Sequence, residues 1–111
     1  MALLITDLVV GKGKIAVKGA LITTQYIGCL KDGTLFDSTY AKGQAFQCVI
    51  GTGRVIKGWD QGILGMKVGG KRKLQIPAEL AYAARKMGAL IPANSDLVFE
   101  IELLEVLTRD D

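Results

Sequence analysis

VIKGWDQGILGM, residues 55–66, is the segment on which the fold depends. Its large apolar side chains recur at intervals of three, four and three residues, which is the spacing of one helix face: Ile56, Trp59, Ile63 and Met66. Three glycines in the same segment lower the helix propensity. We therefore expect only a short helix that is held by packing and ends at Gly65 or at Gly69-Gly70.

The segments around this helix have β-strand character. Residues 20–30, ALITTQYIGCL, are rich in β-branched and aromatic side chains, and Asp32-Gly33 after them is a strong hairpin signal. Further strands are expected at residues 45–50, 71–76 and 97–106, the last of which alternates apolar with charged side chains. The pattern predicts an α+β domain, with an antiparallel β-sheet of about five strands folded over one short α-helix.

The length and composition of the chain indicate one domain over residues 1–111. With 111 residues, of which 50% are hydrophobic, the chain can bury one core and has no room for a second. No apolar run approaches the roughly 18 residues of a membrane-spanning helix. The first ten residues, MALLITDLVV, lack a basic start and contain Asp7, so they make a poor signal peptide. We expect a cytoplasmic monomer with no membrane contact.

The chain contains no histidine, and this absence excludes several kinds of chemistry. Serine–histidine and cysteine–histidine nucleophilic catalysis are impossible, and the commonest transition-metal ligand is missing. Cys29 and Cys48 lie 19 positions apart in apolar surroundings, without metal-ligand spacing, and are expected to be buried free thiols. We expect no metal and no cofactor.

The charge pattern does not indicate a nucleotide or nucleic-acid site. The net charge of +3 is spread along the chain, and the densest basic cluster, Lys71-Arg72-Lys73, is interpreted as a solvated turn and strand edge. Residues 65–71 match the spacing GxxxxGK. However, Arg72 stands where a phosphate-binding loop needs serine or threonine.

Four motifs, in this order, closely resemble the FKBP family of prolyl isomerases. They are DGTLFDS at 32–38, VIKGWDQG at 55–62, GMKVGGKRK at 65–73 and LVFEIELL at 97–104. The resemblance extends from about Lys18 to Val106. It implies an antiparallel sheet curled around one short helix, with an aromatic-lined substrate pocket between them, and so agrees with the fold predicted from the residue pattern.

The resemblance also implies which residues form the pocket. Six of the seven aromatic residues of the chain fall on pocket positions of the family, and Tyr40 is the exception. The residues expected to act in catalysis are Tyr26, Asp37, Trp59, Tyr82 and Phe99. Those expected to bind substrate are Phe36, Phe46, Val55, Ile56 and Ile91. From the sequence alone, the large apolar members would be interpreted as ordinary core and Asp37 as a turn or cap residue.

The implied function is peptidyl-prolyl cis/trans isomerisation of proline-containing peptides and proteins, inhibited by the macrolides tacrolimus and rapamycin. This reaction breaks no covalent bond, so a chain without histidine, metal or cofactor suits it. Two alternatives belong to other classes. One is a peptide-binding or chaperone module that uses the same pocket without turnover, and the other is a basic nucleic-acid-binding domain.

The family's loop after Tyr82 overhangs the pocket, and here it carries Arg85 and Lys86. No acidic residue lies between Glu79 and Asp96. The two cations predict a modest preference for peptides with an acidic residue beside the proline. The alternative is that both side chains point into solvent and select nothing.

Overall fold

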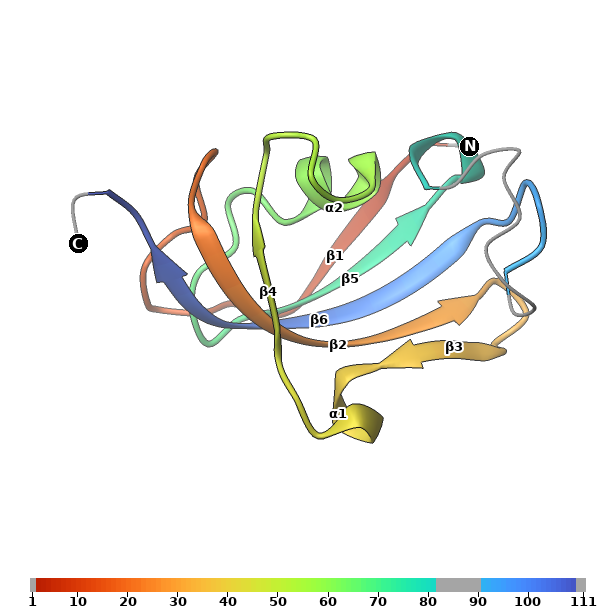
Figure 1. Cartoon of the computed structure of the whole chain (residues 1–111), viewed down its shortest axis with the longest axis horizontal. Coiled ribbons are helices and arrows are strands. Elements are labelled where there is room, and N and C mark those ends of the chain that lie inside the picture. The colour runs from red at the N-terminus through yellow and green to blue at the C-terminus, as the bar shows by residue number, and fades with distance from the viewer. Residues whose placement is uncertain (1, 82–90, 110–111) are drawn as a thin grey trace.

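A computed structural model describes residues 2–81 and 91–109. The described chain forms one antiparallel sheet in the order β1-β5-β6-β2-β3, with β4 also paired to β2 (Figure 1). Its strands are β1 (Leu4–Val9), β2 (Leu21–Leu30), β3 (Leu35–Ser38), β4 (Phe46–Val49), β5 (Lys71–Ile76) and β6 (Leu97–Leu107). The helical elements are α1 (Thr39–Lys42), α2 (Lys57–Gly62) and the 3₁₀ turn η1 (Ala78–Leu80).

The predicted α+β class is confirmed, with one strand more than expected. The additional strand is β1, whose six residues are all exposed and which pairs only with β5 at the sheet edge. Its sequence, LITDLV, lacks the alternation that identifies a half-buried strand. The short elements α1 and η1, of four and three residues, also gave no periodic signal.

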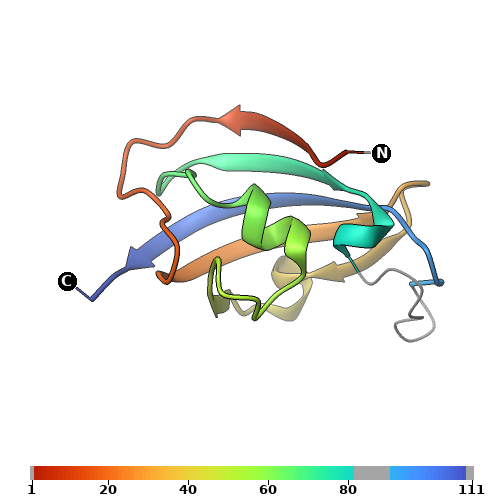
Figure 2. The ribbon, with the colours of Figure 1, turned by 90° about the horizontal axis from the view of Figure 1, so that it is seen from above.

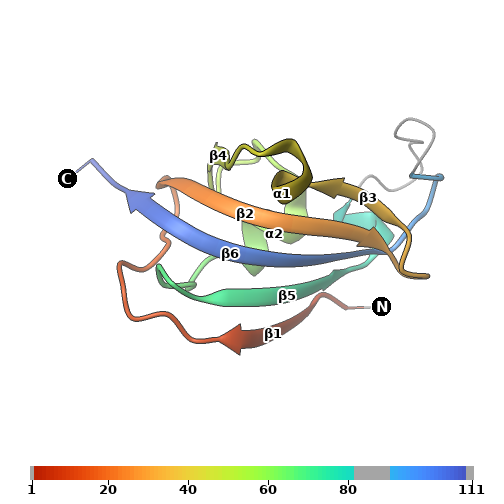
Figure 3. The same ribbon diagram turned by 90° about the horizontal axis from the view of Figure 1, so that it is seen from below.

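The sheet has one covered face and one open face. Helix α2 lies across the covered face, and Figure 2 shows it crossing the strands. Figure 3 shows the open face, where the strands β1, β5, β6 and β2 lie side by side in this spatial order. Strand β6 alternates buried Phe99, Ile101 and Leu103 with more exposed residues, so the core lies between α2 and the curved sheet.

Helix α2 contacts the sheet closely because two of its residues are glycines. A Cβ atom placed on Gly58 would lie 2.5 Å from Ile76 Cγ2, and one on Gly62 would lie 2.7 Å from Leu74 Cδ1. Both distances are far shorter than real carbon contacts. The residues that weaken the helix in isolation therefore allow it to rest on β5.

The helix ends earlier than the apolar stripe predicted. It ends at Gly62, and Ile63 is its C-cap, whereas the expected end was Gly65 or Gly69-Gly70. Ile63 and Met66 are nevertheless buried, because the turn that follows α2 keeps them in the core. Gly65 has a φ of 90° and lies in this turn rather than in the helix.

Arg72 is not the solvated residue that the sequence suggested. Strand β5 is internal, and the Arg72 side chain is only 12% exposed. Its Nε donates to Asp7 Oδ1 at 2.7 Å, and its Nη1 donates to the carbonyls of Gly62 and Leu64. Arg72 therefore ties the C-terminal end of α2 to β5 and β1, while Lys71 is exposed as expected.

The two cysteines are free and only partly buried. Burial raises the pKa of the Cys48 thiol to about 11, and the charge of Asp60 contributes to the same shift. Cys48 is therefore a poor nucleophile at neutral pH. Within residues 2–81 and 91–109, no helix is both long and apolar enough to cross a membrane.

The close contact of α2 predicts an unusual response to alanine. In an exposed helix, glycine to alanine would be stabilising by roughly 1 kcal/mol. At Gly58 or Gly62 the added methyl group would overlap Ile76 or Leu74, and overpacking costs about 1 to 3 kcal/mol. We expect Gly58→Ala and Gly62→Ala to lower the free energy of unfolding, measured by urea denaturation. Gln61→Ala, on the exposed side of the same helix, is the control and should cause no loss. Equal stability of all three variants would contradict the contact.

Candidate active site

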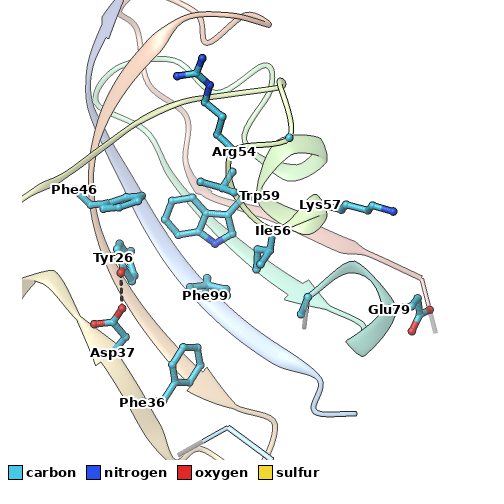
Figure 4. A pocket seen from close by; sticks show the side chains of 13 residues that line it. Tyr26, Phe36, Asp37, Phe46, Arg54, Ile56, Lys57, Trp59, Glu79 and Phe99 are labelled. Atoms are coloured by element: carbon cyan, nitrogen blue, oxygen red, sulfur yellow. Dashed lines mark hydrogen bonds between the residues drawn. The ribbon is translucent and has the colours of Figure 1, made fainter. Parts of the chain in front are cut away.

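A cavity of about 840 Å³ opens between α2, the sheet and the segment before α2. Eight of the residues expected in the pocket line it: Tyr26, Phe36, Asp37, Phe46, Val55, Ile56, Trp59 and Phe99. They come from β2, β3, β4, β6, α2 and the residues just before α2 (Figure 4). Residues that are distant in sequence therefore meet at one surface.

The other two expected residues do not join this group in the described structure. Ile91 is 7% exposed and belongs to the core cluster, but it does not line the cavity. Tyr82 lies outside the described residues, as do Arg85 and Lys86. The predicted catalytic role of Tyr82 therefore stays a prediction.

The floor of the cavity is a cup of aromatic rings in edge-to-face contact. Trp59 lies at its centre, with ring centroids 5.1 Å from Tyr26, 5.4 Å from Phe99 and 5.8 Å from Phe46. This is the arrangement that aromatic quadrupoles favour. The cup is apolar and closely packed, and Trp59 is 4% exposed. Its indole N–H has no acceptor in the described part of the chain.

Asp37 is the polar group of the wall, and its carboxylate is held by two donors. The Tyr26 hydroxyl donates to Asp37 Oδ2 at 2.5 Å, and Lys42 Nζ lies 2.7 Å from Asp37 Oδ1. Burial alone would raise the pKa of Asp37. The hydrogen bonds from Lys42 and Tyr26, together with the Lys42 charge, lower it below its ordinary value. Asp37 is therefore ionised at neutral pH and is not suited to donate a proton.

Helix α1 places Lys42 beside Asp37. Ser38 caps this short helix by accepting from the Ala41 backbone N–H. The buried hydroxyl of Thr39 accepts from the Tyr26 N–H at 2.8 Å, which ties α1 to β2. No motif in the sequence indicated that Lys42 belongs to the site, because only the folded chain brings it to Asp37.

Asp60 fixes the segment that forms the opposite side of the cavity. Its two carboxylate oxygens accept from the backbone N–H groups of Gly51 at 2.8 Å and Gly53 at 2.7 Å. The chain then continues into Val55 and Ile56, which line the cavity. The Ile56 carbonyl accepts from the N–H groups of Trp59 and Asp60. Asp60 was not predicted as a site residue, and the loop geometry alone identifies its positioning role.

A second hollow, of about 520 Å³, lies on the other side of the Tyr26 and Phe46 side chains. Hydroxyl, amide and amino groups from Thr23, Gln44, Gln47 and Lys42 contribute to its lining. No group of three histidine, cysteine, aspartate or glutamate side chains suited to a metal ion occurs in the described parts of the chain.

Comparison with known proteins agrees with this geometry. The sequence model of the FKBP-type peptidyl-prolyl cis-trans isomerase family matches residues 12–104. The chain is 53% identical to the FK506-binding protein of Neisseria meningitidis serogroup A, over 95% of this chain and 96% of that protein. It is 51% identical to the peptidyl-prolyl cis-trans isomerase FPR2 of Saccharomyces cerevisiae, over 82% and 68%. The crystal structure of AtFKBP13 aligns with a TM-score of 0.88 at 47% identity, covering 95% of this chain and 93% of that one.

The Asp37 network predicts a measurable titration. A lowered pKa in the folded state means that the network stabilises the fold above the ordinary carboxyl pKa, and that this contribution is lost as the pH falls through the folded pKa. Tyr26→Phe and Lys42→Met should each raise the pKa of Asp37, measured by carbon-13 NMR of its carboxyl group. Lys12→Met, an exposed residue outside the cavity, is the control. An unchanged Asp37 pKa in both variants would refute the network.

Proposed function

The chain belongs to the FKBP-type peptidyl-prolyl cis-trans isomerase family and is an isomerase of that type; from this premise we propose that the aromatic cavity is its active site. The observation that carries the proposal is the cup of Tyr26, Phe46, Trp59 and Phe99, which contact one another inside that cavity. A substrate proline ring fits such a cup, because the proline ring is apolar and compact.

The reaction needs rotation and not bond cleavage. Resonance gives the peptide C–N bond partial double-bond character, and the barrier to rotation is about 18 to 20 kcal/mol. For a bond before proline the two isomers differ by only about 0.5 to 1 kcal/mol, although they exchange over tens to hundreds of seconds. The enzyme therefore has to favour the twisted amide over both planar forms.

An apolar cavity favours the twisted amide by differential binding. When the amide twists, resonance is lost, the carbonyl oxygen loses negative charge and the proline nitrogen becomes amine-like. The twisted form is therefore less polar than the planar form and loses less by leaving water. A cavity lined by rings stabilises it relative to the planar ground state. Each tenfold gain in rate requires about 1.4 kcal/mol, so several such contributions are needed.

Polar groups at the edge of the cup orient the substrate. We assign one of its carbonyls to the Ile56 backbone N–H, as the family resemblance implies, and a second to the Tyr82 hydroxyl. The Ile56 N–H is free for this role, because within the described residues it donates to no acceptor. Asp37 remains ionised and held by Tyr26 and Lys42, so its role is to set the electric field of the wall without transferring a proton.

We also propose the substrates, the inhibitors, the cellular compartment and the oligomeric state of the enzyme. Its substrates are proline-containing peptides and proteins, and the macrolides tacrolimus and rapamycin compete for the same cup. The N. meningitidis relative is named for binding FK506, which supports this choice of ligand. The two free thiols favour the reducing cytoplasm. We also propose that the enzyme acts as a monomer.

Catalysis of exchange is the direct test of this function. Micromolar protein should accelerate cis/trans exchange of a short leucine–proline peptide, measured by NMR exchange spectroscopy, and tacrolimus or rapamycin should abolish the acceleration. Peptide binding with an unchanged exchange rate would instead identify a binding module without turnover. Absence of both would remove the proposed function.

Substitutions in the cup and in the wall should separate stability from rate. Trp59→Ala removes a buried ring, so it should lower the free energy of unfolding by about 3 to 5 kcal/mol as well as the activity. Asp37 is part of a partly exposed ion pair, and such pairs contribute about 0 to 1 kcal/mol. Asp37→Val should therefore keep most of the stability while kcat/KM falls by about tenfold or more. Equal losses of stability in the two variants, with no separate loss of rate, would show that Asp37 is structural only.

A further inference from the structure

The mouth of the cavity carries charged side chains that the proposed mechanism does not use. Among the described lining residues, the charged ones are Asp37, Arg54, Lys57 and Glu79. Asp37 is already neutralised by Lys42 at 2.7 Å. The other three are exposed, and no ion pair or side-chain hydrogen bond holds any of them within the described chain. Their charges are therefore available to a bound peptide.

The two cations share one rim, and their backbone is fixed. Arg54 follows Gly53, whose N–H is held by Asp60 at 2.7 Å, and Lys57 is the first residue of α2. Val55 and Ile56 lie between them and line the cavity. The rim is thus a segment with a restrained backbone and an exposed positive side chain on each side of its apolar centre. Figure 4 shows Arg54 on the side of Trp59 and Phe46, and Lys57 beyond Ile56.

Among the described lining residues, the one anion without an ion pair belongs to a different element. Glu79 is contributed by η1, after β5, whereas both cations come from residues 54–57. Among the described lining residues, these three charges sum to one positive charge and are contributed by two different elements of the mouth. A peptide lying in the cavity meets the positive rim on one side and the negative η1 side on another.

We propose that Arg54 and Lys57 are specificity-determining residues, which favour substrates with an acidic residue beside the proline. The proposal rests on the proposed function, because the proline must occupy the aromatic cup for its neighbours to reach this rim. The four aromatic rings of the cup carry no charge, so they cannot distinguish charged residues beside the substrate proline. The charged side chains of the rim can make this distinction. Since Glu79 repels acidic groups on its own side, the preference is expected on one side of the proline and not on both.

The expected size of the preference for acidic peptides follows from the exposure of the Arg54 and Lys57 side chains. Two exposed cations acting on one carboxylate should change kcat/KM by about three- to fivefold, and each alone by less. Such an interaction is screened beyond roughly 10 Å at 0.1 M salt and beyond roughly 3 Å at 1 M salt. The preference should therefore be clear at low ionic strength and vanish at high ionic strength.

The experiment compares matched peptides in NMR exchange spectroscopy. One series places Glu, Gln or Lys immediately before the proline, and a second series places the same residues immediately after the proline of a leucine–proline pair. The enzymes are the unsubstituted protein, Arg54→Gln/Lys57→Gln, and the control Lys12→Gln/Lys67→Gln. The control removes the same net charge at exposed positions that do not line the cavity. Arg85 and Lys86 are retained in all three, so they cannot account for a difference between them.

The expected result is a Glu-to-Lys ratio of kcat/KM of about three to five at low salt in one series. The ratio should fall to about one in the Arg54→Gln/Lys57→Gln enzyme and persist in the control. The single variants then assign the effect to Arg54 or Lys57. A ratio of one in both series, or a ratio that survives the double substitution, would overturn the proposal and leave the isomerase function intact. No acceleration of the neutral Gln peptides would instead end the proposed function, and this inference with it.

Discussion

The close contact between α2 and β5 is the constraint on which the rest of the site depends. Gly58 and Gly62 allow the helix backbone to rest on Ile76 and Leu74 with no side chain between them. At this separation the Trp59 ring lies in the centre of the cup, in contact with rings from three strands. A Cβ atom at either position would overlap these side chains, so the side chains or the helix would have to shift. Packing of the core and geometry of the site are therefore set by the same contact.

The polar parts of the site are held by elements too short to be stable alone. Helix α1 has four residues and α2 has six, so neither would form in water as an isolated peptide. Each is fixed by specific contacts: Thr39 ties α1 to the backbone of Tyr26, and Arg72 binds the carbonyls at the end of α2. Asp60 restrains the loop before α2 in the same way. The result is a preorganised cavity whose wall groups hold their positions before substrate arrives.

The cavity has an apolar centre and a charged mouth, which have different roles. Among the described lining residues of its centre, Asp37 is ionised and is held by Tyr26 and Lys42, so it is not free to exchange a proton. This suits a reaction whose barrier is resonance and not bond cleavage. At the mouth, Arg54, Lys57 and Glu79 remain exposed and free of ion pairs in the described structure. The centre accounts for the rotation of any proline peptide, and the mouth is where one peptide can be distinguished from another.

The sequence by itself determined the fold class, the helical segment and most of the pocket. The stripe of Ile56 and Trp59, the hairpin signal at Asp32-Gly33 and the alternation in residues 97–106 are local patterns, and local patterns can be recognised without coordinates. The tertiary structure alone decided which polar groups meet. Lys42 lies only five residues from Asp37 in sequence, yet its pairing depends on the capped turn of α1. The burial of Arg72 depends on β1, an edge strand without alternation, and the described structure packs Ile91 in the core cluster. Charge pairing, burial and edge pairing depend on neighbours that are distant in the chain, and for that reason no pattern within one segment could predict them.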